Sequence, residues 1–537
     1  MLLARRPFFV VAHTKHKRPP ALPRPRVERT PTRPLVAVVF VVTVVAATLE
    51  RWWFGRAWNE AGSLWSTFYY GDASRLVDYA VAILQGRSFD NGIPFHPPGW
   101  PLLLAGFLKV TGAEKGADVV VPVAAVKLFI ASLSGLTVGC AALLAGEMVG
   151  LEAMLAVALL GTFHFGHIVE GTVANSEALY GLLLVLALWT AWRWLRHESG
   201  HRILWAALAG AIGGCALLVR AEFLACAVVL VVMAWWIDGA RLKGSRYGIA
   251  AFVLACGVVL APTTIWHWRT LSAFNASHVG RVAGPLPRFA PVTSYGPFNF
   301  AIANHEFADG GPNRDHPLLD QCSQAIDSRL SSGELDLSCP AVYDLYVHGY
   351  AIGARWLLTD PAAALTLLTS KVEMMAGFLS HGYLIDDVGP DVDGTRRRVD
   401  LVDPQRWWLL PIHLALLAGG VGVLRRQSVA LAVLASALAA LVGSTVLFYG
   451  YVRLGVAYLP AIWVFQGAAL GAAVRGVARR QGDRRLAAAA GAIGLLLLAY
   501  DGAHVRAPRP LALDGKRTPT GALNQDEAIE IRRPAGS

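Results

Sequence analysis

Long apolar runs alternate with short polar segments along most of this chain, as in residues 182–192, 224–237 and 252–265. A helix needs about 20 apolar residues to cross roughly 30 Å of hydrocarbon, and several windows approach that length. The pattern therefore predicts an all-α polytopic membrane protein with about eleven transmembrane helices. The expected spans lie near residues 35–50, 119–145, 151–169, 175–195, 203–219, 221–237, 248–267, 406–424, 428–448, 454–474 and 486–500. The run at 221–237 is short, and a re-entrant segment there stays open.

The composition also separates the chain from ordinary soluble proteins. Of its 537 residues, 55% are hydrophobic and 16% are charged, whereas soluble domains carry about 25% charged residues. We therefore do not expect a single large soluble core.

Basic residues in the short loops predict the orientation, because Lys and Arg stay on the cytoplasmic side. When the basic N-terminal tail is placed inside, every short basic loop falls on the same face. These loop residues are Arg196, Arg202, Arg241, Lys243, Arg246, Arg425, Arg426, Arg475, Arg479, Arg480, Arg484 and Arg485. The net charge of +11 then follows from topology, and no nucleic-acid partner is expected. We expect a multi-pass protein of the plasma (inner) membrane.

This topology predicts seven consecutive segments of the chain. They are a disordered basic cytoplasmic tail (1–34), the first transmembrane helix (35–50), a first external loop (51–118), transmembrane helices two to seven (119–267), a large external loop domain (268–405), transmembrane helices eight to eleven (406–500) and a flexible, external C-terminal tail (501–537).

The first external loop contains an amphipathic pattern. Apolar positions 76, 77, 80, 81, 83 and 84 predict a helix over 74–84 that lies on the membrane interface. Asp72 precedes this helix, where a carboxylate can cap the free N–H groups of a helix start. Asp78 lies roughly 240° further around a helix of 3.6 residues per turn, so it points elsewhere and is a weaker functional candidate.

The large external loop domain is expected to contain helices around 317–331 and 341–379. Asp360 followed by Pro361 is an N-cap with proline at the first helical position, which marks a new helix start. Cys322 and Cys339 also lie in this domain. An oxidising compartment would permit a disulfide between them, and the sequence leaves the bridge and two free thiols equally open.

One group of potential metal ligands occurs in the same domain, at His305, Glu306, Asp309, Asp315 and His316. Its spacing matches no standard ligand set, and turn residues surround it. We interpret it as a surface loop, with a contact to an acceptor or a metal site as the alternatives.

Ionisable residues near the outer ends of the spans are candidates for a site, because charges at membrane depth are costly. They are Glu170, Glu177, Arg220, Glu222, Arg269 and Arg453. Arginine suits phosphate because its planar fork donates two hydrogen bonds at once. The set therefore predicts a site for an anionic lipid headgroup. Interfacial snorkelling and internal ion pairs are the structural alternative.

Several motifs occur in the order that is typical of one enzyme family. They are Gly71-Asp72 followed by Asp78-Tyr79-Ala80, His96-Pro97-Pro98, Asn175-Ser176-Glu177, Leu217-Leu218-Val219-Arg220-Ala221-Glu222, the stretch from Ala261 to Arg269, and the stretch from Tyr295 to Asn304. Over about residues 70–460, the ordered set resembles GT-C glycosyltransferases. The most similar groups are the bacterial protein-mannosyltransferase-like (family 39-type) and aminoarabinose-transferase-like members.

The resemblance implies transfer of a sugar, with inversion, from a polyprenyl-phosphate carrier to a glycan, lipid or protein acceptor on the external (periplasmic) face. Asp72 would be the catalytic carboxylate. The residues implied to hold the donor phosphate are His96, Arg220, Arg269 and Arg453, and the supporting residues are Asp78, Glu177, Glu222 and Asn299. A transporter of envelope-lipid precursors or a non-catalytic membrane scaffold is the alternative function.

Two departures from the family pattern matter. Many relatives have Asp-Glu where this chain has Asp72-Ala73, so the resemblance leaves a divalent cation open and makes a two-carboxylate metal site there doubtful. The late arginine motif keeps Arg453 and loses its second arginine, which weakens the expectation that Arg453 binds phosphate.

Overall fold

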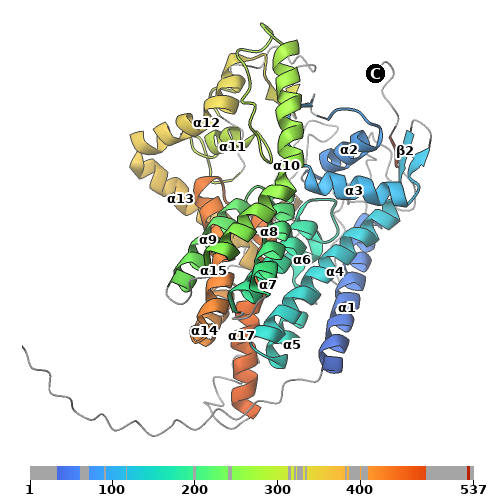
Figure 1. Ribbon diagram of the computed structural model, residues 1–537, viewed down its shortest axis with the longest axis vertical. Helices are drawn as coiled ribbons and strands as arrows, with labels where there is room; N and C mark the ends of the chain where they lie inside the picture. The colour runs from blue at the N-terminus through green and yellow to red at the C-terminus, as the bar shows by residue number, and fades with distance from the viewer. Residues whose placement is uncertain are drawn as a thin grey trace, which may run out of the picture.

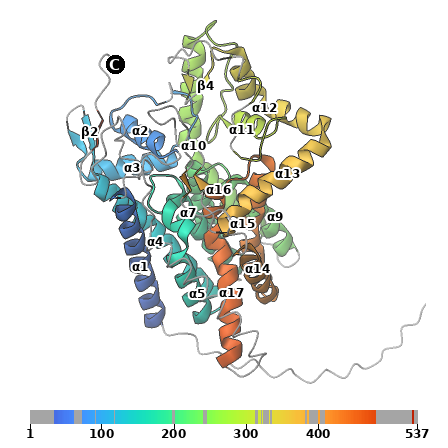
Figure 2. The ribbon, with the colours of Figure 1, turned by 180° about the vertical axis from the view of Figure 1, so that it is seen from behind.

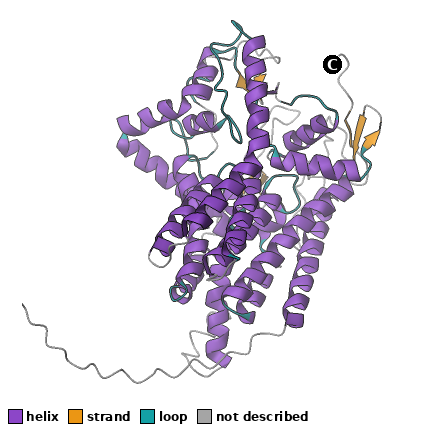
Figure 3. Ribbon diagram, viewed as in Figure 1, coloured by secondary structure: helices purple, strands orange, loops and turns teal. Residues whose placement is uncertain are grey.

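A computed structural model of the protein describes residues 33–60, 72–89, 92–115, 118–196, 201–239, 245–311, 316–319, 322, 331–332, 335–380, 384–385, 399–400, 409–478 and 529–531. Helices dominate these residues, and the strands are very short (Figure 3). The predicted cytoplasmic tail before residue 33, the span at 486–500 and most of the C-terminal tail lie outside the described residues.

Long apolar helices form a bundle, as the sequence predicts. They are α1 (Arg33–Glu60), α4 (Val123–Met148), α5 (Leu151–Phe163), α7 (Glu177–Arg196), α8 (Arg202–Val219), α9 (Phe223–Gly239), α10 (Ser245–Ser277), α14 (Leu409–Leu424), α15 (Ser428–Leu447) and α17 (Leu459–Ala478). In Figure 1, α1 begins and α17 ends at the lower end of the molecule, whereas α2, α3, α11 and α12 lie at the upper end. Every predicted span within the described residues falls on a helix.

By length and composition, seven described helical segments can cross a membrane. They are Arg33–Arg56, Val123–Met148, Glu177–Arg196, Arg202–Val219, Arg246–Ser277, Pro361–Leu379 and Ser428–Leu447. The chain is thus a polytopic helical membrane protein. Pro361–Leu379 was expected to be external, and in Figure 1 its helix α13 lies beside α12, towards the upper end of the molecule.

Exposed aromatic residues on α10 mark the two membrane interfaces. Tyr247 is exposed near the start of this helix, and Trp266 and Trp268 are exposed further along it. Tyr247 and Trp266 are separated by about 29 Å at 1.5 Å per residue, which matches the hydrocarbon thickness. Leu254 and Val258, between them, are also exposed. The remainder of α10 therefore extends beyond the membrane on the side of Trp268.

Three predicted spans differ from the structure at their boundaries. The span at 119–145 begins later, because Asp118–Val121 is the strand β2 and Pro122 precedes α4. Proline disfavours helix in the residue before it, and the β-branched valines favour a strand. The span at 151–169 divides at His164 into α5 and the short α6 (Phe165–Glu170). The span at 454–474 is preceded by the short α16 (Val452–Val456) and a turn.

The segment between α1 and α4, predicted to be the first external loop, folds against the upper end of the bundle. Helix α2 (Ala73–Leu84) confirms the predicted amphipathic helix, and α3 (Gly99–Val110) follows it. Next, β1 (Glu114–Lys115) pairs antiparallel with β2, and β7 (Ile529–Ile531) pairs with the other edge of β2. Strand β7, from the end of the chain, therefore lies beside β2 at the upper end of the molecule (Figure 2).

The segment predicted to be external, here called the external segment, has a hydrophobic core of its own, which includes Leu271, Phe274, Phe298, Leu345 and Tyr346. Its elements are α11 (Gly296–Ile302), β3 (Ser331–Ser332), β4 (Leu335–Asp336), α12 (Pro340–Thr359), α13 (Pro361–Ala376), a 3₁₀ helix (Gly377–Ser380), β5 (Leu384–Ile385) and β6 (Val399–Asp400).

Two helices were predicted in this segment, with different outcomes. The helix at 341–379 is confirmed as α12 and α13, and the Asp360 carboxylate accepts a hydrogen bond from the Ala363 N–H at 3.0 Å. The helix at 317–331 is wrong where residues are described, since 317–319 form a turn and β3 begins at Ser331.

Side chains from the external segment satisfy the carbonyl groups at the end of α15. Lys371 Nζ donates to Asn304 Oδ1 at 2.7 Å and to the Val446 carbonyl at 3.4 Å, and Asn304 Nδ2 donates to the Leu447 carbonyl at 2.9 Å. A cation near free carbonyls at a helix C-terminus is favourable. Gly450 follows closely, and a Cβ there would lie 1.8 Å from the Lys371 carbonyl oxygen. This packing fixes the connection from α15 to α16.

A disulfide joins Cys322 to Cys339, which settles the alternative that the sequence left open. The bridge closes a loop with a sequence separation of 17. We predict that the double substitution Cys322→Ser and Cys339→Ser lowers the free energy of unfolding by about 3 kcal/mol, since a loop of this length loses about that much chain-entropy stabilisation. Thermal unfolding of the purified protein checks this. A reductant should destabilise the wild type and leave the double variant unchanged.

Candidate active site

The centre of the candidate site is Glu177, the first residue of α7. Its side chain is 2% exposed. One oxygen, Oε1, lies 2.6 Å from Arg220 Nη1 and 3.0 Å from Arg453 Nε. The first contact is a hydrogen bond, and the second is an ion pair without hydrogen-bond geometry. A buried carboxylate is thereby shared by two arginines from distant parts of the chain.

Arg220 is held where α8 ends. Its backbone is extended, which turns the guanidinium back towards α7. Nε and Nη2 donate to the two oxygens of Glu222 at 2.9 and 3.0 Å. The guanidinium carbon also lies 5.7 Å from the centre of the Tyr180 ring. Arg220 is therefore a fully engaged cation, bidentate to one carboxylate and bonded to another.

Arg453 connects this ion network to Asp72. On α16, its Nη2 donates to Asp72 Oδ2 at 2.6 Å. The side chain of Arg453 is 12% exposed, whereas that of Asp72 is 50% exposed. Asp72 occupies the N-cap position of α2, but its side chain makes no capping hydrogen bond. The capping interpretation of this side chain is therefore wrong, because the arginine contact takes its place.

The surroundings of Asp72 keep it ionised. Loss of solvent around the carboxylate acts to raise the pKa of Asp72, but the charge and hydrogen bond of Arg453 outweigh this effect. Together with smaller contributions from His96 and Arg220, they hold the pKa of Asp72 well below its ordinary range. At neutral pH, Asp72 is a negatively charged group at the open side of the network.

His96 lies close enough to influence Asp72 because the His-Pro-Pro-Gly turn packs against the end of α8. A Cβ on Gly99 would lie 2.7 Å from the Leu218 carbonyl oxygen, so only glycine permits this approach. The His96 ring also packs between Phe89 and Phe95, with centroids at 5.9 and 4.8 Å. His96 thus lies near Asp72, and its role in binding the donor phosphate stays a prediction.

Three other predicted residues do not join the ion network. Arg269 is exposed on α10 next to Trp268, and it makes no ion pair or hydrogen bond with another described residue. Asp78 is exposed on α2. Asn299 is half-buried on α11, and its hydrogen bonds with other described residues come from its backbone alone. Their predicted roles rest on the family resemblance.

Two tyrosines were not among the predicted site residues. Tyr295 stacks on Phe95 with ring centroids 4.9 Å apart. Tyr449 lies between α15 and α16, where loss of solvent and the charges of Glu222 and Asp72 raise the pKa of Tyr449 to about 12. Its hydroxyl therefore stays protonated and can donate a hydrogen bond. In the sequence, Tyr449 is marked only by its place in the aromatic run before Arg453.

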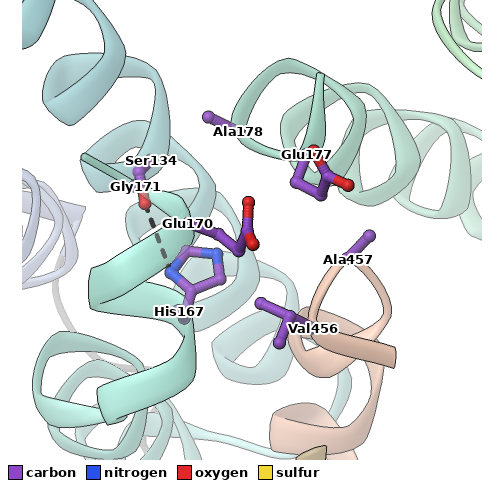
Figure 4. A pocket seen from close by; sticks show the side chains of 8 residues that line it. All are labelled: Ser134, His167, Glu170, Gly171, Glu177, Ala178, Val456 and Ala457. Atoms are coloured by element: carbon purple, nitrogen blue, oxygen red, sulfur yellow. Dashed lines mark hydrogen bonds between the residues drawn. The ribbon is translucent and has the colours of Figure 1, made fainter. Parts of the chain in front are cut away.

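A small pocket lies on the other side of Glu177 (Figure 4). It is lined by Ser134, His167, Glu170, Gly171, Glu177, Ala178, Val456 and Ala457. Its polar wall depends on Arg51 of α1, which is fully buried and donates to Ser134 Oγ at 2.7 Å and to His167 Nδ1 at 2.8 Å. Neither Arg51 nor His167 was predicted to belong to a site.

The predicted cluster in the external segment differs from a surface loop. His305 and His316 are buried, with ring centroids 4.7 Å apart, whereas Glu306 is exposed. Asp315 lies outside the described residues. Within the described ranges, no group of three or more His, Cys, Asp or Glu side chains could hold a metal ion. The expectation of a divalent cation therefore stays untested.

Comparison with protein-family models and with curated proteins gave no match. Among solved structures, the archaeal oligosaccharyltransferase AglB from Archaeoglobus fulgidus, in complex with an inhibitory peptide and a dolichol-phosphate, is 13% identical with a TM-score of 0.45, over 88% of this chain and 55% of that one. The apo form of the Archaeoglobus fulgidus oligosaccharyltransferase is 13% identical with a TM-score of 0.47, over 89% of this chain and 56% of that one.

ArnT from Cupriavidus metallidurans, bound to undecaprenyl phosphate, gives 14% identity and a TM-score of 0.33, over 83% of this chain and 79% of that one. The chain spans little more than half the length of the two oligosaccharyltransferase structures. Likeness at this level does not decide what the chain does.

We predict that Glu177→Ala lowers the free energy of unfolding by about 3–5 kcal/mol, because it leaves Arg220 and Arg453 buried with one carboxylate fewer. Thermal unfolding in detergent measures the loss. Glu373→Ala, which removes an exposed carboxylate from α13, is the control and should change the value by no more than about 0.5 kcal/mol. Equal effects of the two substitutions would contradict the description of Glu177 as the centre of the network.

The buried histidine pair predicts acid sensitivity of the external segment. Burial and the neighbouring His305 lower the pKa of His316 to about 4, whereas an unfolded histidine titrates near about 6.5. Between these values the unfolded chain binds the additional proton, so stability falls as the pH is lowered from about 6.5 to about 4. Unfolding temperatures at pH 7 and pH 5 should converge in His316→Gln. Substitution of the exposed His348 by Gln should leave the wild-type dependence intact.

Proposed function

We propose that the protein transfers a glycosyl group from a polyprenyl-phosphate-linked sugar to an acceptor hydroxyl on the external face of the membrane. One observation carries this proposal: a half-exposed, ionised carboxylate, Asp72, is held by a buried arginine where apolar helices end. A carboxylate that faces the open side can contact the acceptor hydroxyl, and an arginine beneath it can contact the donor phosphate. The family resemblance of the sequence supports the same activity.

The acceptor is proposed to bind at Asp72. A general base must lie within hydrogen-bond reach of the proton that it takes, and the half-exposed Asp72 side chain leaves room for a hydroxyl. The low pKa of Asp72 makes it a weak base in the resting site. Its role is therefore to orient the hydroxyl and to take its proton late, when the oxygen has begun to bond to the sugar.

The donor phosphate is proposed to bind at Arg453. Its Nη1 makes no hydrogen bond with another described residue, while Nη2 is bonded to Asp72. Arg453 would thus contact the phosphate with one nitrogen and the catalytic carboxylate with the other. Arg220 contributes positive charge from behind Glu177. His96 and Tyr449, near Asp72, are further groups that can donate hydrogen bonds to phosphate oxygens.

The proposed step balances as a single displacement. The acceptor oxygen forms a bond to the anomeric carbon, the bond from that carbon to the phosphate oxygen breaks, and the acceptor proton passes to Asp72. The leaving phosphate gains one negative charge as the bond breaks. Arginine donors already directed at that position stabilise this charge without reorganisation. Attack from the side opposite to the phosphate inverts the configuration.

We predict that Asp72→Asn lowers the rate of transfer by about 10²–10⁴-fold, the usual contribution of a general base. The assay uses membranes, a radiolabelled polyprenyl-phosphate sugar and a native envelope extract as the source of acceptors. Asp344→Asn, the same change at an exposed carboxylate of α12, is the matched control and should retain wild-type transfer. Wild-type activity in an Asp72→Asn protein that inserts normally would refute the catalytic assignment.

A further inference from the structure

Two carboxylate oxygens face the pocket behind the ion network without a hydrogen-bond partner. They are Oε1 of Glu170 and Oε2 of Glu177, each almost inaccessible to solvent. Figure 4 shows the two side chains on opposite walls of the same pocket. A buried oxygen without a partner is costly, so this pair of oxygens calls for a proton or a hydrogen-bond donor between them.

Glu170 has little else to stabilise a negative charge. It is 1% exposed. Its other oxygen accepts a long hydrogen bond of 3.4 Å from Asn175 Nδ2, and no Lys or Arg of the described residues forms an ion pair with it. An isolated buried carboxylate generally takes up a proton instead. Glu170 is therefore suited to act as a proton carrier beside Glu177.

His167, on the same helix as Glu170, offers the pocket a hydrogen-bond donor instead of a metal ligand. Arg51 has only donors, so His167 Nδ1 must accept its hydrogen bond, and His167 is neutral with the proton on Nε2. A protonated Nε2 cannot be a metal ligand, but it can donate a hydrogen bond into the pocket. The pocket thus combines one donor with two acceptor carboxylates, which suits a shared proton.

The charge of the ion network makes this proton relevant to ligand binding. Arg220 and Arg453 face three carboxylates, Asp72, Glu177 and Glu222. The network is therefore already negative without Glu170, and an added phosphate anion would be repelled. A proton on Glu177 would remove one of these charges. It would also release the Nε of Arg453 and the Nη1 of Arg220 from their shared carboxylate.

We propose that the Glu170–Glu177 pair binds one additional proton when an anionic phosphodiester occupies Arg453 and Arg220. The inference rests on the proposed function, because it assumes that the donor phosphate binds there. Protonation of Glu177, with Glu170 as its hydrogen-bond partner, turns both arginines towards the phosphate. Release of the phosphate returns the proton and restores the closed network.

Other groups could contribute to a pH dependence at this site. Those around the pair are His167 on α6, the hydrogen-bonded hydroxyls of Tyr180 and Tyr458, Arg220 and Glu222 after α8, Arg453 on α16, and Asp72 with His96 and Tyr449 on the open side. Asp72 stays ionised at neutral pH, and the contact with Arg51 keeps His167 neutral. His96 is then the other group that could take up the proton, so the experiment must distinguish protonation of His96 from protonation of Glu177.

The test is isothermal titration of the full-length protein in lipid nanodiscs with a short-chain polyprenyl methyl phosphodiester, whose single charge is constant across the pH range used. Measurement in two buffers of different ionisation enthalpy gives the number of protons taken up. We expect about one proton per bound phosphodiester in the wild type. We expect nearly none in the isosteric Glu177→Gln variant, which lacks the carboxylate that takes up the proton, and about one proton per bound phosphodiester in His96→Asn.

Binding to the wild type without proton uptake would overturn the inference and leave the proposed function standing. So would uptake that persists in Glu177→Gln and disappears in His96→Asn. The wild-type measurement decides even if Glu177→Gln fails to fold. Absence of binding at every pH would overturn the proposed donor site together with the inference.

Discussion

The rest of the site depends on one constraint, which is that the buried carboxylate of Glu177 must be compensated by cations. In a low-dielectric interior an unpaired charge is prohibitively costly, so α7, the end of α8 and α16 can pack only when Arg220 and Arg453 both reach Glu177. Arg453 then contacts Asp72 through Nη2. A single buried charge thereby brings together segments that are separated by most of the chain and determines where the half-exposed carboxylate lies.

The site forms where the helices are interrupted. The break at His164 precedes Glu170, α8 ends in the extended Arg220, and α15 ends before the turn that leads to Arg453. Non-helical backbone at this depth requires protein partners for its polar groups. Lys371 and Asn304 supply them at the end of α15, so the external segment helps to position Arg453. Binding groups and helix interruptions occur together because side chains at helix ends can converge on one point.

Much of this arrangement was readable from the sequence, and the remainder depends on tertiary contacts. The apolar runs predicted the helices, and the basic loops predicted their orientation. Helix α2 and the Asp360 cap were predicted from local sequence signals, and the structure confirms both. Charged residues at span ends singled out Glu177, Arg220 and Arg453, and the family resemblance added Asp72 to them. No sequence pattern reveals that Asp72 prefers Arg453 to its own helix. Nor does one reveal that Arg51 is buried against His167, because the partners lie far apart in the chain.

In the proposed mechanism, Arg453 contacts both the donor phosphate and the carboxylate that binds the acceptor. An experimental structure of the protein with a bound polyprenyl-phosphate analogue tests this most directly. The account predicts a phosphate oxygen within about 3 Å of the Arg453 guanidinium, on the side of Asp72, with the contact between Arg453 and Glu177 lengthened. A phosphate bound elsewhere, for instance at the exposed Arg269, with the contacts of Glu177 to both arginines intact, would contradict it.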